Sequence, residues 1–280
     1  MSPTDRPRPA PASPLRVATT LALWSAAVAG GDSADDAIDA FAAAGMPHGA
    51  RTASLRAAEA IPQLPGPGEQ HSGHAELLAF VRRGGPAALL LPTPGDLRGL
   101  PPGGEITLPA LDAGAVVVLP DHGVGLVPAD GHWRAYPCGT AHPAMAERDA
   151  RALVAGAITD ATAALSRADV ARSAGDPRER LHQLILAEEV ALPRRMPPAA
   201  SALLAQSITL HALLLVAFTH ETAAATVRDL QAVDAALAPL AAAVRESRRT
   251  AVAMAVAALH PAPSHQGAGY GDAATRRQAG

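Results

Sequence analysis

The amino-acid sequence predicts an α+β protein, in which a small, mainly antiparallel sheet with helices is followed by an all-α helical bundle. Three observations support this fold class. Nearly all of the β-forming sequence lies in residues 86–137, the flanking segments are Ala-rich and helical in pattern, and the last segments repeat apolar residues at spacings of three and four. With 280 residues, the chain is long enough for two domains of ordinary size.

We expect these two domains to lie between two disordered tails. Residues 1–14 are Pro-rich and residues 261–280 contain no core-forming residue, so neither segment has an apolar face to bury. The α+β domain is expected at 15–170 and the helical bundle domain at 176–260. The sequence SAGDP at 173–177 is typical of a break between them.

The first domain begins with helical segments. Leu21 and Trp24, in the first of them, are expected in the core. Asp32 or Ser33 is placed to cap the second helix. Helices are predicted at 15–30, 32–45, 51–60 and 75–83.

Residues 17–29 also have the composition of a signal peptide, because they follow several Arg residues and end in an Ala-Val-Ala triplet. Thr19, Thr20 and Ser25 dilute this apolar run, and the Pro-rich segment before it is long for a signal peptide. A retained, buried helix is therefore the preferred interpretation, and cleavage is the alternative.

Four strands are predicted in the β region. The first is wholly apolar and is therefore expected to be central and buried. Asp130-Gly131 is a two-residue hairpin signal, which predicts that the other three strands form a meander. The predicted strands are 87–92, 115–119, 124–128 and 132–136.

The C-terminal half is predicted to be helical, with helices at 148–165, 177–190 and 199–219. An apolar seam follows, which is expected to pack on the 199–219 helix within one chain; pairing with a second chain is the alternative. Pro239 interrupts the seam and should kink the helix or begin a new one. The seam consists of Leu230, Val233, Leu237, Leu240 and Val244.

Composition excludes several classes of function. A net charge of −3 and a pI of about 6.4 give no electrostatic basis for binding nucleic acid. The 199–219 helix carries polar residues that make it a costly membrane span, so no membrane association is expected. Every basic side chain is Arg, which indicates a GC-rich genome and argues against reading any single Arg as a ligand contact. Cys138 is the only cysteine, which is consistent with the cytoplasm.

The most distinctive motif is the Gly/Pro-rich loop at residues 91–104, LPTPGDLRGLPPGG. Asp96 and Arg98 at its tip are candidate ligand-binding residues, together with His122 and His132 beside the predicted hairpin. A structural interpretation competes for the loop, because Pro-Gly-Asp is an ordinary turn composition.

No catalytic or metal signature accompanies this loop. The chain contains eleven His residues but no HExxH or paired CxxC motif, so neither a metal site nor a cofactor is predicted. A nucleophile motif of the GxSxG type is absent as well. His211, within an apolar helix, is interpreted as a hydrogen-bonded core residue rather than a ligand.

Several stretches together resemble a conserved family of actinobacterial proteins of unknown function. They are LRVATTLALWSAAVAG, LPTPGDLRGLP with the following ALDAGAVVVLP and GLVP, ATAALSRADVAR and SALLAQS. The resemblance covers about residues 15–260, and the loop is its most specific element. It implies a cytoplasmic protein of helices with a small sheet, and it transfers no catalytic residue because the family carries no assigned activity.

Two functions therefore compete. The first is a non-enzymatic interaction or scaffold protein that contacts a protein partner through the C-terminal helices or the sheet edge. The second is a small-molecule-binding protein or enzyme that uses the 91–104 loop. Convergence of Asp96, Arg98, His122 and His132 on one concave pocket would favour the second. The oligomeric state cannot be inferred from the sequence.

Overall fold

The computed structural model describes residues 13–100, 103–129, 131–167, 177–219 and 227–260. The predicted tails fall outside these residues, apart from residues 13 and 14 at the start of the first helix. In chain order the described elements are α1 (Pro14–Ala29), α2 (Ala34–Ala43), β1 (Ala50–Thr52), α3 (Leu55–Ala60), α4 (His74–Arg83), β2 (Ala88–Leu90), α5 (Thr107–Ala113), β3 (Val116–Leu119), the 3₁₀ turn η1 (Pro120–His122), β4 (Val124–Ala129), β5 (His132–Pro137), α6 (Glu147–Arg167), α7 (Pro177–Glu188), α8 (Pro198–Thr219) and α9 (Val227–Leu259).

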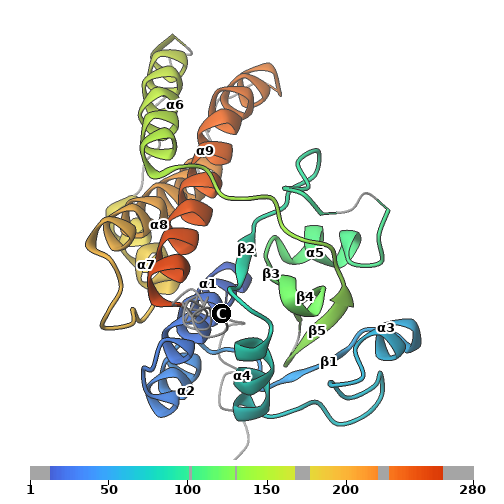
Figure 1. The fold of residues 1–280 in the computed structure, drawn as a ribbon. Helices are drawn as coiled ribbons and strands as arrows, with labels where there is room; N and C mark the ends of the chain where they lie inside the picture. The colour runs from blue at the N-terminus through green and yellow to red at the C-terminus, as the bar shows by residue number, and fades with distance from the viewer. Residues whose placement is uncertain (1–12, 101–102, 130, 168–176, 220–226, 261–280) are drawn as a thin grey trace, which may run out of the picture.

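The N-terminal half contains a five-stranded sheet in the order β1-β5-β4-β3-β2 (Figure 1). Neighbouring strands are antiparallel except β1, which runs parallel to β5. The predicted meander is confirmed as β3, β4 and β5. All four residues of β3 are buried, which fits its place inside the sheet. The sheet is thus mixed but mainly antiparallel, as the sequence predicts.

The hairpin between β4 and β5 has the expected register. Ala129 pairs with His132, so the connection is two residues long, and Gly131 has a φ of 76°. A positive φ at this position is characteristic of tight hairpin turns and explains the need for Gly. Asp130 lies outside the described residues.

The edges of the sheet differ from the prediction. Residues 50–52 form β1, although the sequence suggested helix from 51, and only residues 55–60 are helical. The strand at 88–90 is buried at Leu89 and Leu90, but it is an edge strand and not a central one. Helices α1 and α9 pack against this edge, which gives an edge strand the burial of a central one.

Helix α1 is a core element, as predicted. Leu21 is fully buried and Trp24 nearly so, and the Trp24 indole Nε1 donates a hydrogen bond of 2.7 Å to the Ala191 carbonyl oxygen. The hydroxyls of Thr19 and Thr20 donate to carbonyl oxygens four residues earlier in the helix. These bonds satisfy the polar groups, so the helix can be buried despite them.

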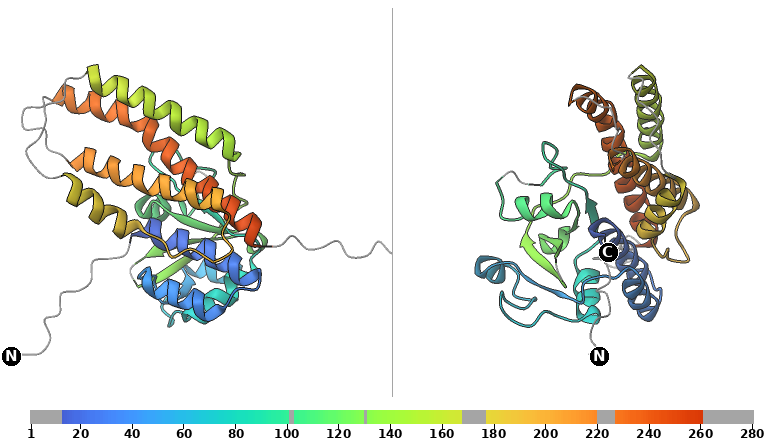
Figure 2. Two further views of the ribbon diagram at one scale, coloured as in Figure 1. Left: turned by 90° about the vertical axis from the view of Figure 1, so that its left-hand side faces the viewer. Right: turned by 180° about the vertical axis from the view of Figure 1, so that it is seen from behind.

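The C-terminal helices form a layer. Figure 2 shows α6, α9, α8 and α7 side by side above α1 and the sheet. The described residues of the predicted seam pack within the chain: Leu237 and Val244 form one buried cluster with Leu214 of α8 and Ala161 of α6. The side chain of Leu230 lies outside the description. The partner surface therefore includes α6 as well as α8. Pro239 lies inside α9, which is continuous through it.

Helix α9 also joins the two halves of the chain. Its last turns carry Ala251, Val252 and Ala255, which are buried in the same cluster as α1 and the sheet. One helix therefore contributes to the packing of both halves. Residues 173–177, where the sequence suggests a domain break, lie outside the described part of the chain apart from Pro177.

Helix α8 is long and apolar enough by composition to cross a membrane, and within the described residues it is the one helix that meets this test. In the structure α8 packs between α7 and α9, with Leu203 and Leu204 buried. Leu213 and Phe218 remain half exposed.

Candidate functional site

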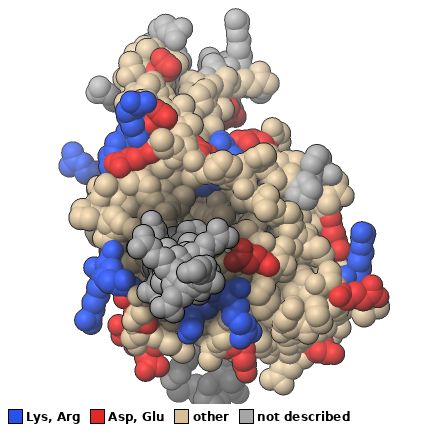
Figure 3. Space-filling model, viewed as in Figure 1, with Lys and Arg blue, Asp and Glu red and all other residues tan. Residues whose placement is uncertain are grey.

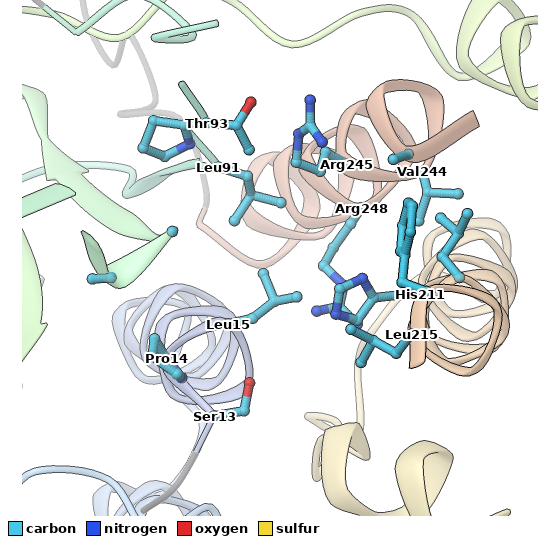
Figure 4. A pocket seen from close by; sticks show the side chains of 16 residues that line it. Ser13, Pro14, Leu15, Leu91, Thr93, His211, Leu215, Val244, Arg245 and Arg248 are labelled. Carbon is cyan, nitrogen blue, oxygen red and sulfur yellow. The ribbon is translucent and has the colours of Figure 1, made fainter. Parts of the chain in front are cut away.

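A cavity of about 350 Å³ lies where α1, α8 and α9 meet the end of β2. Figure 3 shows the surface hollowed between α9 and the sheet, and Figure 4 shows the cavity from close by. Most of its wall is apolar. The wall consists of Ser13, Pro14, Leu15, Leu91, Pro92, Thr93, Ala113, Gly114, His211, Leu214, Leu215, Phe218, Ala241, Val244, Arg245 and Arg248.

Arg248 is the most unusual residue of this wall, because its side chain is only 2% exposed. Its Nη1 donates to Oε2 of Glu188 at the end of α7, at 3.1 Å. Its Nη2 is buried and has no hydrogen-bond partner among the described residues. Burial lowers the pKa of the Arg248 guanidinium, and the Glu188 carboxylate opposes this effect. The cavity therefore contains a buried cation that retains hydrogen-bonding capacity.

Arg245 lies one helical turn before Arg248 and lines the same cavity. Its Nη2 is 3.8 Å from Oδ2 of Asp96, a long ion pair. Its Nε is buried, and no residue that the structure describes forms a hydrogen bond with it. Asp96 has a closer partner in Arg98, at 2.8 Å. Burial, followed by the charge of Arg98, lowers the pKa of Arg245. Arg245 is thus the more weakly paired cation of the cavity.

The neighbouring Glu246 holds two segments of chain on α9. Its carboxylate accepts from Arg98 at 2.8 Å and from Arg249, and it also accepts from the backbone N–H of Met145. Arg249 in turn donates to the carbonyl oxygens of His142 and Pro143. These bonds fix the 91–104 loop and the chain before α6 against α9. Among the described residues, Arg98 is the one non-glycine residue with a positive φ, at 50°.

His211 of α8 is the third polar side chain of α8 and α9 that lines the cavity. In Figure 4 its ring lies beside Arg248, between Leu15 and Leu215. Burial, and then the charge of Arg248, lowers the pKa of the imidazole. His211 is therefore neutral at pH 7 and contributes hydrogen-bonding capacity without charge.

The four site residues predicted from the sequence do not converge. Asp96 and Arg98 pair with each other, and Arg98 docks the 91–104 loop on α9. His122 follows β3, where its Nε2 is 3.1 Å from the Phe80 carbonyl oxygen and its ring stacks on the Phe80 ring. His132 is buried at the start of β5.

The ring of His132 stacks on that of His71, with a centroid distance of 6.2 Å. None of the four predicted residues lines the cavity described above. Ligand binding by these four residues stays a prediction. Within the described ranges, no three His, Cys, Asp or Glu side chains are grouped so that they could hold a metal ion.

The sequence does hold a signal for the residues that line the cavity. The six residues from 245 to 250, RESRRT, interrupt the apolar part of α9 that begins at Ala235, and all but Arg245 are buried. Consecutive polar residues of a surface helix face several directions, so burial of the whole run requires neighbours on all sides. These neighbours are α7, the 91–104 loop and the segment that precedes α6.

Comparison with known proteins supports the family resemblance. The family model described as "Rv1486c-like protein, N-terminal domain" matches residues 18–150, and the model described as "Rv1486c-like protein, C-terminal domain" matches residues 148–249. The chain belongs to the Rv1486c-like family. A relative, "Uncharacterized protein MT1533" of Mycobacterium tuberculosis (strain CDC 1551 / Oshkosh), is 27% identical over 287 residues, covering 87% of this chain and 97% of the relative. No solved structure matches the chain.

The cavity lies at the junction of the two Rv1486c-like regions. Leu91 and Thr93 come from the N-terminal region, and His211 and Arg248 come from the C-terminal region. Ligand sites occur preferentially at such junctions.

Proposed function

We propose that this Rv1486c-like protein is a non-enzymatic, cytoplasmic protein that binds an apolar small molecule in the cavity between α1, α8 and α9. The observation that carries the proposal is a mostly apolar wall around about 350 Å³, interrupted by a few polar groups. Ligand sites in proteins have this combination of size and lining. Leu91, Pro92 and Thr93 of the distinctive loop contribute to the wall, which links the loop to the ligand.

The scaffold interpretation stays a second prediction. The half-exposed Leu213 and Phe218 on α8 are apolar surface that it could use. Phe218 also lines the cavity, so it lies where the cavity reaches the surface. The cavity is the more specific feature, because single exposed apolar residues are normal on protein surfaces.

The length of the ligand provides a direct test. If each non-hydrogen atom needs about 30 Å³, the volume of a water molecule in the liquid, the cavity holds about twelve of them, which corresponds to a chain of about ten carbons with its head group. We expect affinity to rise with chain length in a series of primary alkanols and alkanoates from about six to about fourteen carbons, and to fall beyond about ten. Isothermal titration below the micelle concentration measures this. A steady rise without an optimum, or no binding, overturns the proposal.

Two substitutions on the same helix sharpen the test. Leu215→Trp fills the cavity and should shift the optimum to shorter chains, whereas Leu213→Trp, at a position that is 44% exposed and outside the cavity, should leave the optimum unchanged. Ala241→Leu on α9 fills the same space from the opposite wall and serves if Leu215→Trp does not fold. Equal behaviour of the cavity-filling variants and the control contradicts a ligand in this cavity.

A further inference from the structure

The guanidinium groups of the cavity are incompletely bonded. Nη2 of Arg248 and Nε of Arg245 are buried and have no hydrogen-bond partner in the described part of the chain. Buried polar atoms are nearly always paired, and a buried charged group without its bonds is especially costly. Both residues line the same cavity. A ligand that accepts hydrogen bonds at this place would complete the pairing that the described residues leave open.

The charges around the cavity are also unbalanced. Four guanidinium groups, those of Arg98, Arg245, Arg248 and Arg249, share three carboxylates, those of Asp96, Glu188 and Glu246. No Asp or Glu is among the described residues that line the cavity. The group therefore carries one positive charge in excess, and its least compensated members face the cavity.

Resting on the proposed function, we propose that the ligand is an apolar monocarboxylate whose head group is bound by Arg248 and Arg245. The planar guanidinium fork matches the geometry of a carboxylate, and hydrogen bonds between charged groups are stronger than those between neutral groups. A single negative charge balances the single excess positive charge. The apolar tail then lies against Leu15, Leu214 and Phe218, which line the rest of the cavity.

His211 favours the same assignment. Its ring lies beside Arg248, and as a neutral imidazole it can donate a hydrogen bond to a carboxylate oxygen. A phosphate monoester is a poorer fit, because its dianion would leave a net negative charge in a largely apolar site. A cationic head group would be repelled by the two guanidinium groups that line the cavity.

The test compares three ligands that share one tail: decanoate, decanol and decylamine. Because a hydrogen bond to a charged group contributes about 1.5–3 kcal/mol, decanoate should bind roughly tenfold to a hundredfold more tightly than decanol. Decylamine should not bind measurably. Higher ionic strength should reduce the preference for decanoate without changing the affinity for decanol.

Substitution of the cations isolates the head-group contact. Arg245→Met should remove most of the preference for decanoate and leave decanol binding within about threefold. Arg148→Met removes an equal charge from an arginine that is 93% exposed on α6 and should change neither affinity. Arg248→Met is made together with Glu188→Met, so that no buried charge is left unpaired; this pair of substitutions should remove the preference as well.

The outcomes separate this inference from the proposed function. Equal binding of decanoate and decanol to the wild type, or equal loss of both in the arginine variants, overturns the carboxylate assignment and leaves the apolar cavity as a ligand site. Absence of binding by all three probes overturns both.

Discussion

The buried ion pair between Arg248 and Glu188 supports a quantitative prediction. The two side chains are 2% and 8% exposed, and their closest atoms are 3.1 Å apart. Glu188→Gln keeps the shape of the side chain and an oxygen that can accept from Arg248, but it removes the negative charge. The guanidinium then stays buried with no charge to compensate it.

The size of the effect follows from the geometry. Two unit charges about 4 Å apart attract each other by about 4 kcal/mol at an effective dielectric constant of about 20. Removal of one member of a buried pair typically costs about 3–5 kcal/mol, because the other charge remains desolvated. Since Gln retains a hydrogen bond, we expect the free energy of unfolding to fall by about 3 kcal/mol.

Urea denaturation of the full chain, followed by circular dichroism, measures this loss. Glu189→Gln is the matched control, because it removes the same charge from the adjacent, exposed position and should change stability by less than about 0.5 kcal/mol. Saturating decanoate should stabilise the Glu188→Gln variant more than the wild type, because the carboxylate supplies the missing charge. Equal stability of the two variants would refute the reasoning.

Three further predictions concern the fold and its pH dependence. Gly131→Val should cost about 1–3 kcal/mol through its positive φ alone, since nothing lies near the new side chain, whereas Gly139→Val in an open, unstrained loop should cost little in the same denaturation assay. Leu237→Ala should lower the free energy of unfolding by about 2–5 kcal/mol, whereas Leu213→Ala, at an exposed position, should lower it far less. Sedimentation across a dilution series should show a monomer at every concentration. A dimer that Leu237→Ala dissociates into folded monomers would place the seam between chains. The pKa of His211 is lowered by folding, so below the unfolded value of about 6.5 the unfolded chain binds more protons than the folded chain, and stability falls as the pH falls. His211→Gln should therefore reduce the loss of stability at acid pH. An unchanged dependence of stability on pH would contradict a lowered pKa at His211.

The parts of the fold that depend on near neighbours could be predicted from the sequence. Asp130-Gly131 indicated the hairpin, and Ser33 was one of two expected caps for α2, where its hydroxyl accepts from the backbone N–H groups of residues 35 and 36. The apolar spacing in α9 predicted burial of Leu237. In each case a few adjacent residues specify the backbone geometry.

The parts that depend on distant segments could not be predicted. β1 has only three residues, too few for a pattern, and it exists because it pairs in parallel with β5, some eighty positions later along the chain. The apolar run of β2 predicted burial, but the same burial arises at the sheet edge once α9 covers it. Composition does not distinguish coverage by strands from coverage by helices.

The candidate site was only partly visible for the same reason. The 91–104 loop was identified as distinctive, and its first residues do line the cavity. Because every cation of the chain is Arg, the sequence does not distinguish Arg245 and Arg248 from the other arginines, and the apolar neighbours of His211 predict a core residue. These three side chains line one cavity only because folding brings α8, α9 and the loop together.

The position of the bound head group tests the central claim most directly. A crystal structure of the full chain with decanoate brominated at its terminal carbon locates both ends of the ligand, because the bromine is identified by its anomalous scattering. We predict that the carboxylate lies within hydrogen-bonding distance of Arg248 Nη2 and that the bromine lies among the leucines of the cavity wall. A ligand bound elsewhere, or one with its bromine beside Arg248, would contradict the account.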